Sequence, residues 1–394
     1  MKITRVTTRP LSAALKKPFI TAKRAVEKLE NILVTVHAAD LAGYGEAACA
    51  REVTGETQGS VAEAVHQHIA PAIIGADPRD IHDISRRISK AVEGNSAAKC
   101  GVECAAYDLF AKTLGVPLYR ALGGSVNTLA NDITISADTE EEMIKDALSA
   151  LEAGFKTLKI KLGRFPETDG QTLINIWRSI LGYYPRENPD RDESASRAVS
   201  PVSRPALRVD ANQGWTPGIA LQFMRKWDSE NTPVELIEQP VPADDLSRLS
   251  FVTSHAKFPV YADESVFSAR DAREVLERRA ANGVNIKLAK SGGIAEAWRV
   301  KTLCDIYGAH CLVGCVLESR LGASAAAHFA AAAGITRVDL DGPFLLAEDP
   351  FTGGPVFQGG DIRFTEEPGI GLEPTGKWRE PSAGEIETAR SSSE

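Results

Sequence analysis

Short apolar stretches that end in a charged residue recur through the second half of the chain. Stretches such as LRVDANQG and VNIKLAKSGG have the length of a buried strand and carry the charge at its carboxyl end. The charges return about every 24–28 residues, or at twice that spacing, which is one strand plus one covering helix. The residues concerned are Lys159, Lys161, Asp210, Glu238, Asp263, Lys287, Asp339 and Asp341. The pattern predicts an α/β barrel.

The position of each charge within its strand predicts where its side chain points. Alternate residues of a strand share a face, so Lys159 and Lys161 point to one side and the intervening apolar residues to the other. We expect the lysines to face the barrel interior, and the same alternation places Asp210, Glu238 and Asp263 there. Enzymes with this architecture keep their sites at the carboxyl ends of the strands. The charges are therefore expected to converge at one mouth of the barrel.

The residue types in this cluster indicate a chemistry. Three carboxylates without His or Cys form a hard oxygen site, which suits Mg²⁺, with Mn²⁺ as the alternative, and suits Zn²⁺ poorly. Lysines on separate strands beside such a cation indicate proton transfer next to a carboxylate or carbonyl. Any one of these residues alone fits a solvated or ion-paired side chain better than a catalyst. Their common register favours the functional interpretation.

The motifs that carry these charges resemble those of the enolase superfamily, in its muconate-lactonizing subgroup, over nearly the whole chain. They are the Lys-x-Lys of 159–161, DANQGW at 210–215, EQP at 238–240, ADES at 262–265, and Lys287 followed by the glycines at 292–293. The resemblance implies a modified (β/α)7β TIM-like barrel with an N-terminal α+β capping domain. PLYRALGG at 117–124 is similar to that family's passage from cap to barrel.

The resemblance also implies a role for each charged residue. Asp210, Glu238 and Asp263 would bind Mg²⁺, and Lys161 and Lys287 would be the acid and base on opposite faces of the substrate. Lys159 would be the auxiliary that tunes Lys161. The His/Asp pair that marks the mandelate racemase branch is not evident, which favours the two-lysine mechanism.

The DLDGP sequence that contains Asp339 and Asp341 resembles the dipeptide epimerases within this subgroup. In that family the Asp-x-Asp pair holds the free α-ammonium of a dipeptide, and two neighbouring carboxylates form a plausible ammonium clamp. The alternative is an Asp pair in a solvated turn before Gly-Pro.

The first part of the chain has the pattern of a separate α+β domain. Residues 1–8 and 31–37 are predicted as strands, and three helical stretches follow, the third over about 96–114. We divide the chain into a capping domain at 1–124, a catalytic barrel at 125–352, a segment returning to the cap at 353–380, and a disordered tail at 381–394. A Pro-, Ser- and Arg-rich insertion at about 184–206 is expected on the face away from the site.

Two cap loops are expected to reach the site. In the first, at 19–26, Arg24 aligns with the arginine that meets the substrate side-chain carboxylate in glutamate-specific dipeptide epimerases; the alternative is a surface charge. The second loop, at 49–55, is a predicted lid. Thr134, in the first barrel strand, is a candidate for a backbone or ammonium contact.

Composition adds the compartment and excludes some partners. The net charge of −8 argues against nucleic acid, and no segment has the length and apolarity of a membrane span or export signal. The six cysteines lack metal-site spacing, so we expect buried thiols in a reducing, cytoplasmic setting. The expected partners are a small dipeptide substrate and a second copy of the chain, in a homo-oligomer.

Together these features predict a Mg²⁺-dependent dipeptide epimerase that inverts the C-terminal residue, with L-Ala-D/L-Glu as the first substrate to test. Rivals with the same machinery are an N-acylamino acid racemase, an o-succinylbenzoate synthase and a muconate cycloisomerase. A rival of another class is a catalytically silent barrel that binds a ligand.

Overall fold

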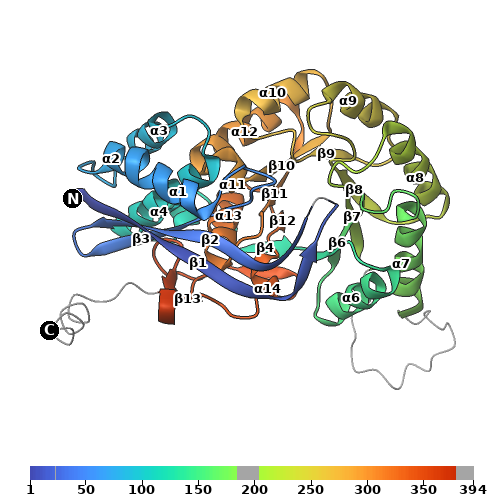
Figure 1. Cartoon of the computed structure of the whole chain (residues 1–394), viewed down its shortest axis with the longest axis horizontal. Helices are drawn as coiled ribbons and strands as arrows, with labels where there is room; N and C mark the ends of the chain where they lie inside the picture. The colour runs from blue at the N-terminus through green and yellow to red at the C-terminus, as the bar shows by residue number, and fades with distance from the viewer. Residues whose placement is uncertain (23, 184–203, 379–394) are drawn as a thin grey trace.

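Two structural parts lie side by side along the long axis of the molecule (Figure 1). The computed structural model describes residues 1–22, 24–183 and 204–378. Most of the predicted insertion at 184–206 and the predicted tail at 381–394 lie outside the described residues. Strands β1–β3 with helices α1–α4 form one part, and a curled sheet with helices α6–α13 forms the other. The mixed α/β architecture agrees with the fold class predicted from the sequence.

The cap is an antiparallel sheet of order β1-β2-β3, and its first two strands are longer than predicted. These strands are β1 (Ile3–Ile20), β2 (Ala25–Ala38) and β3 (Leu41–Ala47). The prediction ended the first strand at residue 8 because charges and Pro10 interrupt its alternation. Since β1 is an edge strand, a proline without an N–H is tolerated there, and pairing with β2 continues to Ile20. The resulting ribbon runs from the cap toward the barrel (Figure 1).

Three helical stretches cover the cap sheet, as the sequence indicates. The elements are α1 (Gln58–Ala64), a π-helical turn (Val65–Ile69), α2 (Ala70–Ile73), α3 (Ile81–Ala91) and α4 (Ser96–Leu114). Helix α4 ends where predicted, at Gly115, which adopts φ +70° as a left-handed cap. Gly43 and Gly45 of β3 lie so close to α4 that an added Cβ would come within 2.1 Å of its backbone oxygens. The helix and the sheet therefore pack backbone to backbone.

The second part is a sheet whose nine parallel segments close into a barrel of eight strands, because the first strand is split in two. Segment β4 (Thr128–Asn131) pairs with β12 (Arg337–Asp339), and β5 (Ile133–Ile135) pairs with β6 (Thr157–Lys161), with Asp132 between them. The other strands are β7 (Ala206–Asp210), β8 (Val234–Glu238), β9 (Val260–Ala262), β10 (Gly283–Lys287) and β11 (His310–Gly314). In the described part of the chain this is the (β/α)7β arrangement, taking β4 and β5 as one strand.

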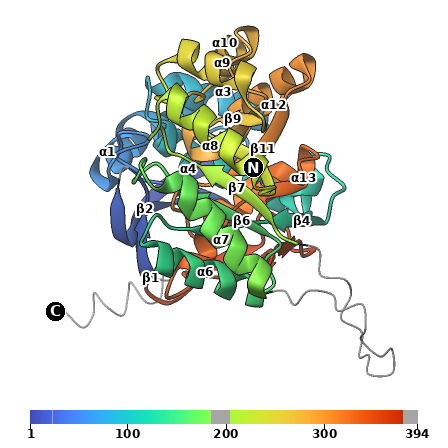
Figure 2. The same ribbon diagram turned by 90° about the vertical axis from the view of Figure 1, so that its right-hand side faces the viewer.

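Helices cover the outside of the barrel (Figure 2). They are α6 (Glu140–Glu152), α7 (Asp169–Tyr183), α8 (Pro217–Ser229), α9 (Leu246–His255), α10 (Ala269–Glu277), α12 (Ile294–Tyr307) and α13 (Arg320–Ala332). Three one-turn helices, α5 (Leu118–Ala121), α11 (Leu288–Ser291) and α14 (Gly342–Leu345), contact elements of the cap. Thr139, Thr216 and Ser268 each accept a hydrogen bond from a first-turn N–H of the helix that follows. No helix among the described residues is long and apolar enough to cross a membrane.

The C-terminal segment contacts both parts. Its strands are β13 (Phe351–Gly353), β14 (Val356–Gln358), β15 (Asp361–Arg363) and β16 (Leu372–Pro374), followed by a 3-10 turn (Gly376–Trp378). Strand β15 pairs antiparallel with β4 of the barrel, while the Leu118 N–H donates to the Gly369 carbonyl at 2.7 Å. The N–H of Ile370 donates to Asp108 of helix α4 at 2.6 Å. The segment ties the barrel to the cap.

Buried cap carboxylates meet the first turns of two barrel helices. Glu46 of β3 accepts hydrogen bonds from the backbone N–H groups of Ser319 and Gly322 at the start of α13, at 3.0 Å in each case. Glu103 of α4 accepts one from the Ala295 N–H in the first turn of α12, at 3.1 Å. Helix N-termini favour negative charge, so these contacts fix the cap onto the barrel. Burial nevertheless raises the pKa of Glu103 to about 7.

A buried arginine occupies the barrel interior. Arg208 Nη1 donates to Asp132 Oδ2 at 2.6 Å and to the Val338 carbonyl at 3.0 Å, and Nε donates to Glu235 Oε2 at 2.9 Å. Only 2% of the side chain is exposed. Asp132 is the residue at which the first barrel strand is split, so the ion pair crosses the barrel at its point of closure.

We predict that Arg208→Met lowers the free energy of unfolding by about 3–5 kcal/mol, because it leaves the buried Asp132 carboxylate without its cation. Chemical denaturation monitored by circular dichroism measures the change. The matched control is Arg337→Met, since Arg337 pairs with the same Glu235 but is exposed and is expected to cost about 1 kcal/mol or less. An equal loss of unfolding free energy in the two variants would contradict the conclusion that the buried Arg208–Asp132 pair stabilises the barrel where it closes.

Candidate active site

A cleft with about 770 Å³ of open space lies over the carboxyl ends of the barrel strands. Both parts of the molecule line it. The cap contributes Phe19, Thr21, Arg24, Glu52 and Val53, and the barrel contributes Thr134, Lys159, Lys161, Asn212, Gln213, Asp263, Glu264, Lys287, Cys315–Leu317, Asp339, Asp341 and Leu345. Eight of the ten residues singled out in the sequence therefore line one cleft, and the other two, Asp210 and Glu238, lie directly beneath it.

The three predicted acidic residues come together. Parallel pairing places Lys161, Asp210 and Glu238 at neighbouring positions of β6, β7 and β8, and Asp263 follows the last residue of β9. One carboxylate oxygen from each of the three acids lies within 4.8 Å of the others, and all three residues are buried. Among the described residues this is the one group of at least three His, Cys, Asp or Glu side chains with that geometry.

The carboxylate cluster fits a divalent cation. Glu238 Oε2 and Asp263 Oδ1 are buried and accept no hydrogen bond; their nearest cations are Lys159 and Lys290, at 2.9 and 2.6 Å. Burial, and the nearby Asp210 charge, raise the pKa of Glu238 to about 8. An all-oxygen set of this size is the donor set that Mg²⁺ or Mn²⁺ takes.

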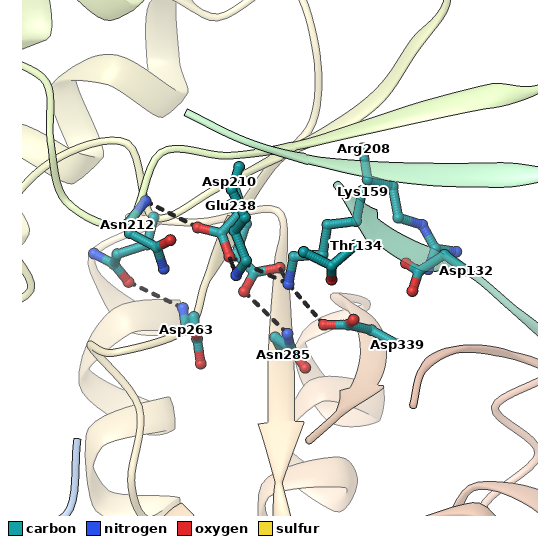
Figure 3. A network of polar contacts seen from close by, with 12 residues as sticks. Asp132, Thr134, Lys159, Arg208, Asp210, Asn212, Glu238, Asp263, Asn285 and Asp339 are labelled. Atoms are coloured by element: carbon teal, nitrogen blue, oxygen red, sulfur yellow. Dashed lines mark hydrogen bonds and ion pairs between the residues drawn. The ribbon is translucent and has the colours of Figure 1, made fainter. Parts of the chain in front are cut away.

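Lys159 is the central cation of the cluster (Figure 3). Its Nζ lies 2.6 Å from Asp339, 2.9 Å from Glu238 and 3.2 Å from Asp210. Burial alone would lower the pKa of this ammonium, but the surrounding carboxylates raise it well above the usual value. Lys159 is therefore held charged and fixed below the cleft, where it offsets the acidic groups.

The other two predicted lysines lie on different sides of the carboxylates. Lys161 Nζ donates to Asp210 Oδ2 at 2.5 Å, and Lys287 Nζ donates to Asp263 Oδ2 at 2.7 Å. Burial opposes the charged form of Lys287, but Asp263 and Glu238 outweigh it and raise its pKa. The two amines come from β6 and β10, which are separated in the sheet by three strands.

Two buried residues that the sequence interpretation passed over support the cluster. Lys290 Nζ lies 2.6 Å from Asp263 Oδ1. Asn285 Nδ2 donates to Glu238 Oε1 at 3.1 Å (Figure 3). In the sequence, the spacing of both residues from Lys287 could have indicated their position. Asn285 precedes Lys287 by two residues and so shares its strand face, and Lys290 follows it by nearly one turn of helix α11.

The loops after β7 and β8 adopt strained backbone at the cleft. Asn212, Gln213 and Gln239 have φ values of +43°, +69° and +36°, a region that non-glycine residues seldom occupy. The conformation is held by side chains: the Asn212 N–H donates to Asp210 Oδ1 at 2.9 Å, and Gln239 Oε1 accepts from the Asp263 N–H at 2.9 Å. These bonds orient two members of the carboxylate cluster.

Asp339 and Asp341 both reach the cleft but differ in their partners. Asp339 ends β12 and pairs with Lys159, whereas Asp341 lies beyond the strand as the cap of α14. Asp341 Oδ2 accepts from the Thr134 backbone N–H at 2.7 Å, so Thr134 contacts the predicted clamp directly through its main chain. Burial and the neighbouring Asp339 charge raise the pKa of Asp341.

Arg24 lies at the tip of the β1–β2 ribbon and lines the cleft, with 14% of its side chain exposed. Arg24 is therefore not the surface charge that the sequence left open as the alternative. Its Nη1 lies 3.5 Å from Oε2 of Glu52, which belongs to the predicted lid loop at 49–55. Glu52 was not singled out in the sequence, and no spacing signal marks it.

Comparison with known proteins identifies both parts of the chain. Residues 3–123 match the mandelate racemase / muconate lactonizing enzyme N-terminal domain family, and residues 142–378 match the enolase C-terminal domain-like family. Together these matches span most of the described residues.

Full-length relatives agree with the two family matches. The L-Ala-D/L-Glu epimerase of Clostridium acetobutylicum is 40% identical over 92% of this chain and 96% of its own. The substrate-liganded L-Ala-D/L-Glu epimerase of Bacillus subtilis superposes with a TM-score of 0.88 at 39% identity, covering 95% and 100% of the two chains. A dipeptide epimerase of Enterococcus faecalis V583, complexed with Mg and L-Leu-L-Tyr, has a TM-score of 0.85 at 35% identity over 95% and 100%. The chain belongs to the enolase superfamily, in its mandelate racemase / muconate lactonizing enzyme family.

Proposed function

We propose that this protein is a Mg²⁺-dependent dipeptide epimerase that inverts the α-carbon of the C-terminal residue, with L-Ala-D/L-Glu as substrate. The observation that carries the proposal is the buried set Asp210, Glu238 and Asp263, with an amine from β6 on one side and an amine from β10 on the other. The choice of substrate class is supported by the relatives, which share the architecture and are named as L-Ala-D/L-Glu or dipeptide epimerases.

Asp210, Glu238 and Asp263 would hold the cation, because their oxygens converge and two of them accept no hydrogen bond. Bound there, Mg²⁺ supplies positive charge against the negative charge that develops on the substrate carboxylate when its α-proton leaves. Lys159 adds a fixed positive charge from beneath, and Lys290 holds Asp263. The site is thus arranged to stabilise an anion that forms during the reaction.

Lys161 and Lys287 are the residues assigned to proton transfer. A two-base epimerisation needs one amine to take the α-proton from one face and a second to return a proton to the other. The two lysines lie against different carboxylates, Asp210 and Asp263, and both reach the cleft. They are therefore suited to act on opposite faces of a substrate bound between them.

Asp339 and Asp341 supply the contact for the free α-ammonium of a dipeptide. Both are buried at the cleft, and only one of them is neutralised by a lysine. An incoming ammonium would compensate the remaining carboxylate through charge-assisted hydrogen bonds. An N-acyl amino acid lacks that cation, so this pair favours a dipeptide over the N-acyl rivals.

The proposal is tested by incubating the protein with Mg²⁺ in D₂O and following α-deuterium incorporation by mass spectrometry. We expect exchange and epimerisation of L-Ala-L-Glu, loss of both on chelation, and little turnover of the N-acetylated dipeptide. Efficient turnover of N-acyl amino acids with poor turnover of free dipeptides would contradict the substrate class. Absence of exchange with every substrate would leave the silent barrel as the better account.

We predict that Lys161→Ala and Lys287→Ala each abolish epimerisation, because each removes the amine that serves one face. One variant is expected to retain solvent exchange of the α-proton of one stereoisomer only. Chiral chromatography combined with deuterium incorporation measures both. Lys145→Ala, on the exposed surface of α6, is the control and is expected to leave the rate unchanged. Epimerisation near the wild-type rate in either active-site variant would refute the two-base assignment.

A further inference from the structure

The tip of the cap ribbon is fixed where it meets the barrel. The Thr21 N–H donates to the Arg24 carbonyl at 2.9 Å, and the Arg24 N–H donates to Thr21 Oγ1 at 3.2 Å, which closes the turn. The Ala137 N–H, just after β5, donates to the Ile20 carbonyl at 3.0 Å. The ribbon therefore presents the Arg24 guanidinium to the cleft from a defined position.

Glu52 faces Arg24 from a second ordered loop. The N–H groups of Val53 and Thr54 donate to the Ala50 carbonyl at 2.9 and 2.8 Å, which makes the lid loop a closed turn. The Glu52 carboxylate lies 3.5 Å from the guanidinium and is 44% exposed. Burial lowers the pKa of Arg24, and Glu52 is the charged group that opposes this shift.

The Arg24–Glu52 pair separates the cleft from a neighbouring hollow. Arg24, Glu52 and Leu317 line both the cleft and this outer hollow, which has about 920 Å³ of open space. Two of the three residues that the two spaces share therefore form one ion pair. Because Glu52 is well exposed, the pair is held by a modest free energy that an incoming group can match.

A substrate side-chain carboxylate that reached Arg24 would meet a guanidinium already paired with an acid. Arg binds a carboxylate best through two parallel N–H donors, and Glu52 competes for those donors. If both acids remain, two negative charges lie around one cation. An uncharged side chain such as an amide encounters no such repulsion and can use the donors that Glu52 leaves.

We propose that Glu52 is a specificity-determining residue that competes with the substrate side chain for Arg24. Glu52 thereby reduces the preference of the site for an acidic over an uncharged polar side chain on the residue whose α-carbon is inverted. The inference rests on the proposed dipeptide epimerase activity and adds to it how the substrate side chain is selected. Glu52 pairs with Arg24, whereas Lys161 and Lys287 pair with other acids, so we expect its influence on substrate binding rather than on the chemical step.

The test measures kcat and KM for L-Ala-L-Glu and L-Ala-L-Gln with the wild-type protein and Glu52→Gln, which keeps the shape of the side chain and removes its charge. We expect the ratio of kcat/KM, acidic over amide, to rise roughly two- to fivefold in the variant, the range for one partly exposed charge interaction. The rise is expected to come from a lower KM for the acidic dipeptide, with kcat little altered.

Two further variants separate this role from a general charge effect. Glu30→Gln removes an acid that lines the outer hollow alone and pairs with Lys28, so the substrate ratio is expected to stay at the wild-type value. Arg24→Gln is expected to lower the ratio, because it removes the group for which the two carboxylates compete. An unchanged ratio in Glu52→Gln, or an equal rise in Glu30→Gln, would overturn this inference and leave the epimerase assignment intact. Absence of α-proton exchange with both dipeptides in the wild-type protein would overturn both.

Discussion

Five acidic side chains and four lysines are buried at one end of the barrel, and the rest of the site depends on how their charges balance. Isolated charges in such a position would be very costly, so each must lie against an opposite charge or a hydrogen-bond donor. Lys159 contacts three carboxylates, and Lys287 and Lys290 hold the two oxygens of Asp263. Burial and the Asp210 charge raise the pKa of Glu238 to about 8, so the lysines compensate its charge only in part. A cation there would complete the charge balance.

The cap forms one side of the cleft at this end of the barrel. Glu46 and Glu103 anchor the cap sheet and α4 to the first turns of α13 and α12, so the ribbon that carries Arg24 has a fixed base. In the proposed function, the barrel supplies the metal ligands and the lysines assigned to proton transfer, while the cap loops supply Arg24 and Glu52, which are proposed to meet the substrate side chain.

The sequence predicted the site where strand periodicity determines position. Lys159, Lys161, Asp210 and Glu238 share a face because alternate strand residues must, and the parallel register brings them together. Periodicity could not predict the Arg24–Glu52 pair, since it joins two loops whose approach depends on tertiary packing. The extension of β1 to Ile20 was missed for a related reason: an edge strand tolerates the proline and charges that weakened its local pattern.

The central claim is that the buried carboxylates require a divalent cation, and calorimetric titration of Mg²⁺ into the chelator-treated protein tests it most directly. The account predicts binding of one Mg²⁺ per chain by the wild-type protein and binding weaker by about tenfold or more in Glu238→Gln, which removes a charged oxygen ligand. Glu235→Gln, on the same strand but paired with Arg208, is the control for folding and local charge. A wild-type protein that binds no Mg²⁺, or a Glu238→Gln variant that binds it as tightly, would contradict the account.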